Sequence, residues 1–172
     1  MDNPPLVGIL MGSANDYEIM LEAARVLKDF GIVMEMTVAS AHRSPQKTSR
    51  YAREASSRGL KVLIVGAGAA AHLAGVIAAE TTLPVVAVPI DSSALKGLDA
   101  LLATVQMPAG IPVATMAIGK AGARNAGILA AQILALGDAS LADGLRRFKT
   151  ELAREIDNKA SLVEERFRKD LG

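Results

Sequence analysis

The chain has 172 residues, of which 51% are hydrophobic, and its formal net charge is +1. A length of this order favours one domain, and a near-neutral charge with only 3% aromatic residues argues against polymeric nucleic acid as a partner. Because the chain contains no cysteine, disulfides, thiolate catalysis and zinc–cysteine sites are excluded.

The N-terminal stretch, residues 1–12, has neither the basic segment nor the long apolar segment of a signal peptide. The apolar stretch at residues 113–136 carries Lys120 and Arg124, so a strand followed by a helix explains it better than a membrane span. We therefore expect a cytoplasmic protein that does not enter a membrane.

Strand and helix patterns alternate along the chain. In chain order, the predicted strands are Leu6–Met11, Val33–Ala39, Val62–Val65, Pro84–Val88 and Ile111–Ile118. Three predicted helices end at Gly31, Gly59 and Ala78. Two further helices are predicted at Leu98–Val105 and Asn125–Leu136. Glycine commonly terminates a helix, and Ser44 followed by Pro45 is typical of a helix start.

The strands are apolar runs that alternate with helices, which is the pattern of a parallel sheet covered on both faces. Five such units predict an α/β fold with a doubly wound, flavodoxin-like or Rossmann-like sheet between two helical layers. We expect a single domain over residues 1–172, with its core at about residues 6–137. Ligands of such sheets bind beyond the carboxyl ends of the strands.

A long amphipathic helix is predicted at about residues 141–169. Its apolar stripe consists of Leu141, Leu145, Phe148, Leu152 and Ile156. The helix would be about 40 Å long at 1.5 Å per residue, which is longer than a small domain easily covers. The pattern leaves two interpretations open: the helix packs on its own sheet, or its distal part reaches a neighbouring subunit.

Two strand-end loops contain groups suited to an anionic nucleotide. The loop Gly12–Asp16 precedes a helix whose free N–H groups and dipole favour an anion, and Ser13 can add a hydroxyl. Asp16 suits ribose hydroxyls because a carboxylate accepts hydrogen bonds, although either side chain could simply cap the helix. In the second loop His42 titrates near neutrality and Arg43 offers a fork for phosphate; a purely structural His42 is the alternative.

The third loop, Gly66–His72, matches the dinucleotide pattern G-x-G-x-x-A, and Asp91 after the next strand would then bind an adenosine ribose. Its place in the third unit, and the lack of a second catalytic domain, weaken this interpretation. Tight helix–strand packing is the simpler explanation.

The two histidines have no carboxylates clustered around them, so no metal site is predicted. The sequence has no G-x-S-x-G elbow, which argues against a serine hydrolase, and no Walker-type lysine, which argues against ATP hydrolysis.

Four segments together resemble the PurE family, and within it the class I branch of 5-(carboxyamino)imidazole ribonucleotide mutases. They are MGSAND (Met11–Asp16), SAHRSP (Ser40–Pro45), GAGAAAHLAG (Gly66–Gly75) and LKGLDALLATVQMPAGIPVAT (Leu95–Thr115). The class II branch, which carboxylates aminoimidazole ribonucleotide with free carbon dioxide, has a lysine in the second motif and lacks the AAHL stretch. Arg43 and residues 70–73 therefore indicate class I.

The resemblance implies a mutase of purine biosynthesis that acts on a small ribonucleotide without metal or cofactor. It also implies a homo-oligomer, expected to be an octamer, with active sites shared between subunits. His42 would be the general acid and base, and the loop Gly66–His72 would close over the reacting carboxylate. The expected substrate-binding residues are Ser13, Asn15, Asp16, Ser40, Arg43, Gly68, Ala69, Ala70, His72 and Leu73.

Several positions depart from the family pattern. Asn15 and Ala100 stand where serine is usual, Ala69 where glycine is usual, and Ala74 where proline is usual. If the glycine at position 69 needs a positive φ, Ala69 strains or reshapes the loop. These departures leave open a divergent paralogue with an altered substrate, or a carboxylase that uses free carbon dioxide. A dinucleotide-binding protein and a non-catalytic nucleotide-sensing paralogue are two further alternatives.

Overall fold

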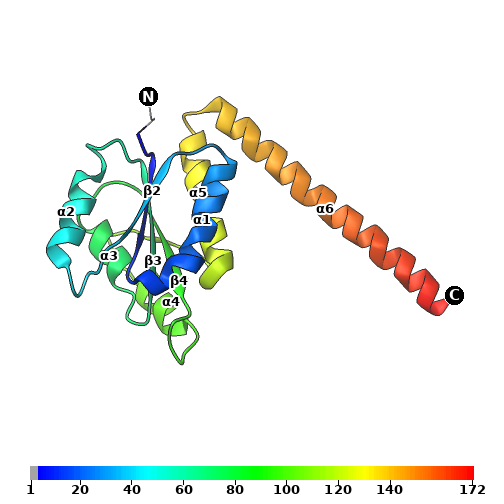
Figure 1. Ribbon diagram of the computed structural model, residues 1–172, viewed down its shortest axis with the longest axis horizontal. Helices are drawn as coiled ribbons and strands as arrows, with labels where there is room; N and C mark the ends of the chain where they lie inside the picture. The colour runs from blue at the N-terminus through cyan, green and yellow to red at the C-terminus, as the bar shows by residue number, and fades with distance from the viewer. Residues whose placement is uncertain (1–3) are drawn as a thin grey trace. The chain divides into compact units, whose positions relative to one another are not determined.

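The computed structural model describes residues 4–172; residues 1–3, which belong to the N-terminal stretch considered above, lie outside the described part. The chain forms two compact units, one that runs to Leu134 and one from Ala135 to Gly172. The first unit is a parallel sheet with helices on both of its faces (Figure 1). The second unit consists mainly of one long helix.

The strands are β1 (Val7–Met11), β2 (Met34–Val38), β3 (Val62–Gly68), β4 (Val85–Ile90) and β5 (Ala114–Thr115). The helices are the 3₁₀ turn η1 (Ala14–Asp16), α1 (Tyr17–Asp29), α2 (Pro45–Ala55), α3 (Leu73–Ala78), α4 (Leu98–Val105), α5 (Gly119–Ala135) and α6 (Ala139–Leu171). The strand order is β2-β1-β3-β4-β5 and every pair is parallel. This is the flavodoxin-like doubly wound order, so the predicted fold class is confirmed.

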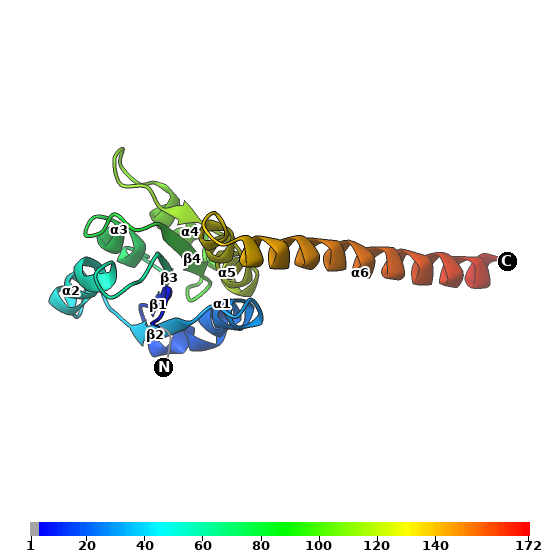
Figure 2. The same cartoon turned by 90° about the horizontal axis from the view of Figure 1, so that it is seen from above.

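The core lies on both faces of the sheet because successive side chains of a strand point to opposite faces. On one face Leu10, Leu63 and Val65 pack with Ile77 of α3. On the other face α1 and α5 lie side by side, and Figures 1 and 2 show them opposite α2 and α3. The helices α1 and α5 approach each other so closely that a Cβ added to Gly127 of α5 would lie 2.9 Å from a carbonyl oxygen of α1.

The fifth strand is much shorter than the predicted Ile111–Ile118. Only Ala114 and Thr115 pair with β4. The chain just before them forms a turn in which the amide of Ile111 donates to the carbonyl of Pro108 at 3.2 Å. Pro112 has no amide hydrogen to add to the ladder. The apolar pattern was therefore correct about a strand but wrong about its length.

The helix α5 begins at Gly119, well before the predicted start at Asn125. Glycine disfavours a helix interior, so the two glycines at positions 119 and 122 concealed this first turn. The structure needs glycine here for another reason. A Cβ at Gly122 would overlap the carbonyl oxygen of Ala117, so only glycine lets the incoming chain pass so close to the helix.

The long helix α6 begins after Asp138, whose side chain accepts a hydrogen bond of 3.0 Å from the amide of Leu141. Such a cap satisfies an otherwise unpaired N–H group of the first turn. The distal apolar side chains are exposed, with Ile156 62% and Phe167 63% accessible. Within residues 4–172 no helix is both long enough and apolar enough to cross a membrane.

A cluster of three side chains links α2 to the edge strand β2. The hydroxyl of Tyr51 donates to one carboxylate oxygen of Glu35 at 2.6 Å, and Arg58 donates to the other at 3.0 Å. The guanidinium carbon of Arg58 also lies 4.6 Å from the centre of the Tyr51 ring. Burial raises the pKa of Glu35, but the hydrogen bonds from Arg58 and Tyr51 and the charge of Arg58 lower this pKa by more.

The lowered pKa of Glu35 predicts a pH-dependent contribution to stability. A carboxylate with a lowered folded-state pKa stabilises the fold above its unfolded-state pKa, about 4.3 for glutamate, and this contribution is lost as the pH falls through the folded-state pKa. We expect Glu35→Gln to reduce the loss of unfolding free energy between about pH 6 and pH 3, measured by urea denaturation. The exposed Glu18→Gln is the matched control, and parallel curves for wild type and Glu35→Gln would contradict the prediction.

Candidate active site

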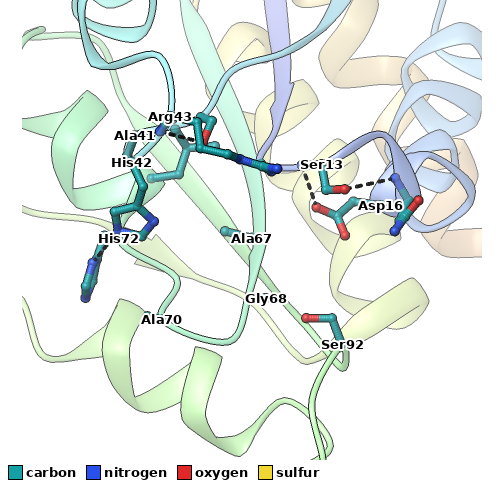
Figure 3. A pocket seen from close by; sticks show the side chains of 14 residues that line it. Ser13, Asp16, Ala41, His42, Arg43, Ala67, Gly68, Ala70, His72 and Ser92 are labelled. Atoms are coloured by element: carbon teal, nitrogen blue, oxygen red, sulfur yellow. Dashed lines mark hydrogen bonds between the residues drawn. The ribbon is translucent and has the colours of Figure 1, made fainter.

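A pocket of about 300 Å³ opens beyond the carboxyl ends of β1, β2, β3 and β4 (Figure 3). The chain leaves β1 toward β2 on one side, while β3 pairs on the other side of β1. Loops diverge at such a switch point, which is where ligands bind in doubly wound sheets. The lining residues are Gly12, Ser13, Asn15, Asp16, Ser40, Ala41, His42, Arg43, Ala67, Gly68, Ala70, His72, Leu73 and Ser92.

The loop after β1 forms a capping turn. The amide of Asn15 donates to Ser13 Oγ at 3.3 Å, and the amide of Ser13 donates to Asp16 Oδ2 at 3.1 Å. The capping role considered for both side chains is therefore present. It leaves the Ser13 hydroxyl hydrogen and the second oxygen of Asp16 for a ligand. Burial raises the pKa of the Asp16 carboxyl, while the hydrogen bond from the Ser13 amide opposes part of this rise.

The loop after β2 is held by hydrogen bonds between its own residues. The amide of Arg43 donates to Ser40 Oγ at 3.1 Å, and Ser44 Oγ donates to the carbonyl of Ser40 at 3.2 Å. Ser44 is at the N-cap position of α2, as predicted, but its side chain forms no cap bond and contacts Ser40 instead. Figure 3 shows the guanidinium of Arg43 directed toward Ser13. One anion could therefore contact both residues.

The two histidines of the chain meet at the other side of the pocket. His42 Nε2 lies 2.9 Å from His72 Nδ1, and the ring centres are 5.0 Å apart in an edge-to-face arrangement. One ring must donate and the other accept, so the contact couples the tautomers of the two rings. Both side chains are exposed to the pocket mouth. Elsewhere in residues 4–172, as here, no three His, Asp or Glu side chains gather as a metal site requires.

The segment from Gly68, the last residue of β3, to Leu73, the first residue of α3, approaches the pocket with small or apolar residues. Gly68, Ala70 and Leu73 line the pocket, whereas Ala69 does not, although it was predicted to bind substrate. Ala69 has a φ of +51°, in the left-handed region that favours glycine. The conditional expectation from the sequence is met: this position does require a positive φ, and alanine occupies it under strain.

Four lining residues were not predicted from the sequence. They are Gly12, Ala41, Ala67 and Ser92. Ser92 follows β4, and the strand-end rule that selected the other loops applies equally to it. The dinucleotide interpretation of the sequence selected the preceding residue, Asp91, as a ligand of the adenosine ribose. Asp91 is exposed and is not among the lining residues.

Comparison with known proteins identifies the family. The model of the AIR carboxylase family matches residues 6–155. The chain belongs to this family. Its relatives include the N5-carboxyaminoimidazole ribonucleotide mutase of Pyrococcus horikoshii, which is 52% identical over 161 residues, 94% of this chain and 90% of that protein. The protein of the same name from Bacillus subtilis is 57% identical over 138 residues, 80% of this chain and 85% of that one.

Solved structures of this family share the fold. The crystal structure of Treponema denticola PurE matches the chain with a TM-score of 0.82 and 30% sequence identity. The match covers 91% of this chain and 97% of that one. The resemblance to the PurE family, predicted from four short motifs, is therefore confirmed.

The strain at Ala69 predicts that Ala69→Gly stabilises this AIR carboxylase family protein. Relief of a left-handed alanine is worth roughly 1–2 kcal/mol, and the greater freedom of glycine in the unfolded chain offsets about 0.4–1 kcal/mol of it. We expect a net gain of up to about 1.5 kcal/mol in the free energy of unfolding, measured by urea denaturation. The neighbouring Ala70→Gly, at an ordinary φ, should instead destabilise; equal effects of the two substitutions would contradict the prediction.

Proposed function

We propose that this AIR carboxylase family protein is a mutase of purine biosynthesis. It converts 5-(carboxyamino)imidazole ribonucleotide into 4-carboxy-5-aminoimidazole ribonucleotide. The relatives named above as mutases support the reaction. The observation that most supports it is one pocket in which a guanidinium and a serine face an imidazole across a loop of small residues.

The nucleotide is proposed to bind at the β1 and β2 loops. Arg43 and Ser13 hold the phosphate, because a guanidinium and a hydroxyl both donate to phosphate oxygens, and Asn15 adds an amide donor. Asp16 accepts from the ribose hydroxyls through the oxygen that its cap bond does not use. Ser40 uses its oxygen as an acceptor for the Arg43 amide, so its hydrogen is free to donate.

The proposed reaction moves one carboxyl group and returns the proton that it uses. The bond between the exocyclic nitrogen and the carboxyl carbon breaks, carbon dioxide leaves, and protonated His42 gives its proton to that nitrogen. C4 of the ring then attacks the carbon dioxide, and the neutral imidazole of His42 removes the C4 proton. One imidazole serves both steps, and holding carbon dioxide beside C4 supplies proximity.

The remaining loop residues are proposed to shape the reacting end. His72 orients the His42 ring through the 2.9 Å contact between their nitrogens. Gly68, Ala70 and Leu73 surround the carboxyl group with small or apolar groups, and Ala69 sets the turn between them. A carbamate loses carbon dioxide more readily in a less polar environment than in water.

The direct test is a stopped assay of the purified protein with the carbamate substrate and no added bicarbonate. We expect the C4-carboxylated product at a rate that bicarbonate does not change. The carboxylase alternative predicts turnover only from aminoimidazole ribonucleotide with free carbon dioxide, and the nucleotide-sensing alternative predicts no product from either. The dinucleotide alternative has no support from Asp91, which does not line the pocket.

The same assay tests His42. We expect His42→Asn to lower activity at least about a hundredfold, the low end for losing general acid–base catalysis, with nearly unchanged nucleotide affinity by calorimetry. Arg43→Ala is the contrasting variant, because removal of a charge-assisted contact should weaken nucleotide binding strongly. Turnover of His42→Asn equal to that of wild type would remove His42 from the mechanism.

We also propose that the protein is a homo-oligomer, with the octamer as the expected size, located in the cytoplasm. Exposed apolar side chains support association. Leu98, Leu102 and Val105 of α4 are each 51% accessible, and apolar side chains of α6 such as Ile156 and Phe167 are exposed as well. Patches of this kind are typical of interfaces. Sedimentation equilibrium should give a mass well above the 17.9 kDa of one chain. A monomer at micromolar concentration would refute the association.

A further inference from the structure

One polar side chain of the pocket has no part in the proposed function. Ser92 lies two residues beyond β4, and the last residue of β4, Ile90, pairs in register with Gly68 at the end of β3. This register places Ser92 beside the loop that surrounds the reacting carboxyl group. Figure 3 shows the Ser92 hydroxyl directed toward Gly68, on the wall of the pocket.

The hydroxyl of Ser92 occupies space that Gly68 leaves free. A Cβ built on Gly68 would overlap Ser92 Oγ, and it would lie 2.8 Å from Ser92 Cβ and 3.1 Å from the carbonyl oxygen of Ile90. Glycine at position 68 is therefore what allows the Ser92 hydroxyl to reach the loop. Within residues 4–172 this exposed hydroxyl has no hydrogen-bond partner, whereas Oγ of the neighbouring Ser93 accepts from the amide of Leu95 at 3.1 Å.

The chemistry of the pocket indicates which ligand group this hydroxyl meets. Among the lining residues of the described chain, Arg43 is the only one with a permanent positive charge, and it faces Ser13. The proposed substrate has two anionic groups, a phosphate and the carboxyl group that moves. A cation at the carboxyl group would stabilise its charge and oppose its release as carbon dioxide, whereas a neutral donor holds it more weakly.

We propose that Ser92 Oγ donates a hydrogen bond to the transferred carboxyl group and so selects carboxylated nucleotides over the carboxyl-free one. This inference rests on the proposed function, because it takes its ligand from that reaction. Ser92 is then a substrate-binding residue of the reacting end. It has no role in holding the phosphate or the ribose.

Two nucleotides that differ only in the carboxyl group test the proposal. Calorimetry would measure the affinity of wild type, Ser92→Ala and the matched control Ser93→Ala for 4-carboxy-5-aminoimidazole ribonucleotide and for 5-aminoimidazole ribonucleotide. We expect Ser92→Ala to weaken binding of the carboxylated nucleotide by about ten- to a hundredfold, as for the loss of one hydrogen bond to a charged group. Its affinity for the carboxyl-free nucleotide, and both affinities of Ser93→Ala, should stay within twofold of wild type.

Three results would overturn the proposal. Ser92→Ala could bind the carboxylated nucleotide as tightly as wild type, it could lose the same factor for both nucleotides, or Ser93→Ala could show the same selective loss. These outcomes leave the proposed function intact, because the wild-type assay without bicarbonate decides that separately. A wild type that binds neither nucleotide would refute the proposed function and this inference together.

Discussion

The parallel register of the four longer strands is the constraint on which the site depends. Because β1 pairs with β2 and with β3, and β3 pairs with β4, their carboxyl ends all lie at one edge of the sheet. Each strand is followed by a loop that turns into a helix, and each loop contributes to the same pocket. A shift of one residue in any of these pairs would turn that strand's side chains to the opposite face. The buried apolar residues on both faces oppose such a shift and so fix the loops.

Small residues allow these loops to approach one another closely. Gly68 leaves the space in which the Ser92 hydroxyl lies. In α5, Gly122 permits a similarly close contact with the chain that leads into this helix, and Gly127 permits one with α1. Ala69 shows the cost of losing such freedom, since an alanine there holds a left-handed backbone. Strain of this kind persists only where the surrounding structure holds it in place, and it is concentrated at functional sites. The shape of the pocket therefore depends on the glycine that lacks a side chain as well as on the side chains that line it.

The permanent positive charge and the two imidazoles lie on different sides of the pocket. Arg43 faces Ser13 on the side suited to an anion, and the histidine pair stands on the side suited to proton transfer. Between them lie glycine and alanine, which offer little stabilisation to a charged group away from water. This division matches the proposed substrate, whose phosphate would stay bound while its carboxyl group leaves and returns. It also agrees with the role proposed for Ser92, because a neutral hydroxyl would hold a departing carboxyl group less strongly than a second cation.

The sequence by itself determined the α/β class, the order of most elements and three of the four loops of the pocket, because apolar periodicity and strand-end motifs are local properties of the chain. It also placed Ser13, His42 and Arg43 at strand ends. The short β5, the early start of α5, the His42–His72 contact and the role of Gly68 beside Ser92 were decided by tertiary structure. Each of these depends on which groups lie close in space: a strand ends where its pairing ends, and a glycine is required where another backbone or side chain passes. Such proximity is set by the packed sheet and helices, and a linear pattern of residues does not contain it.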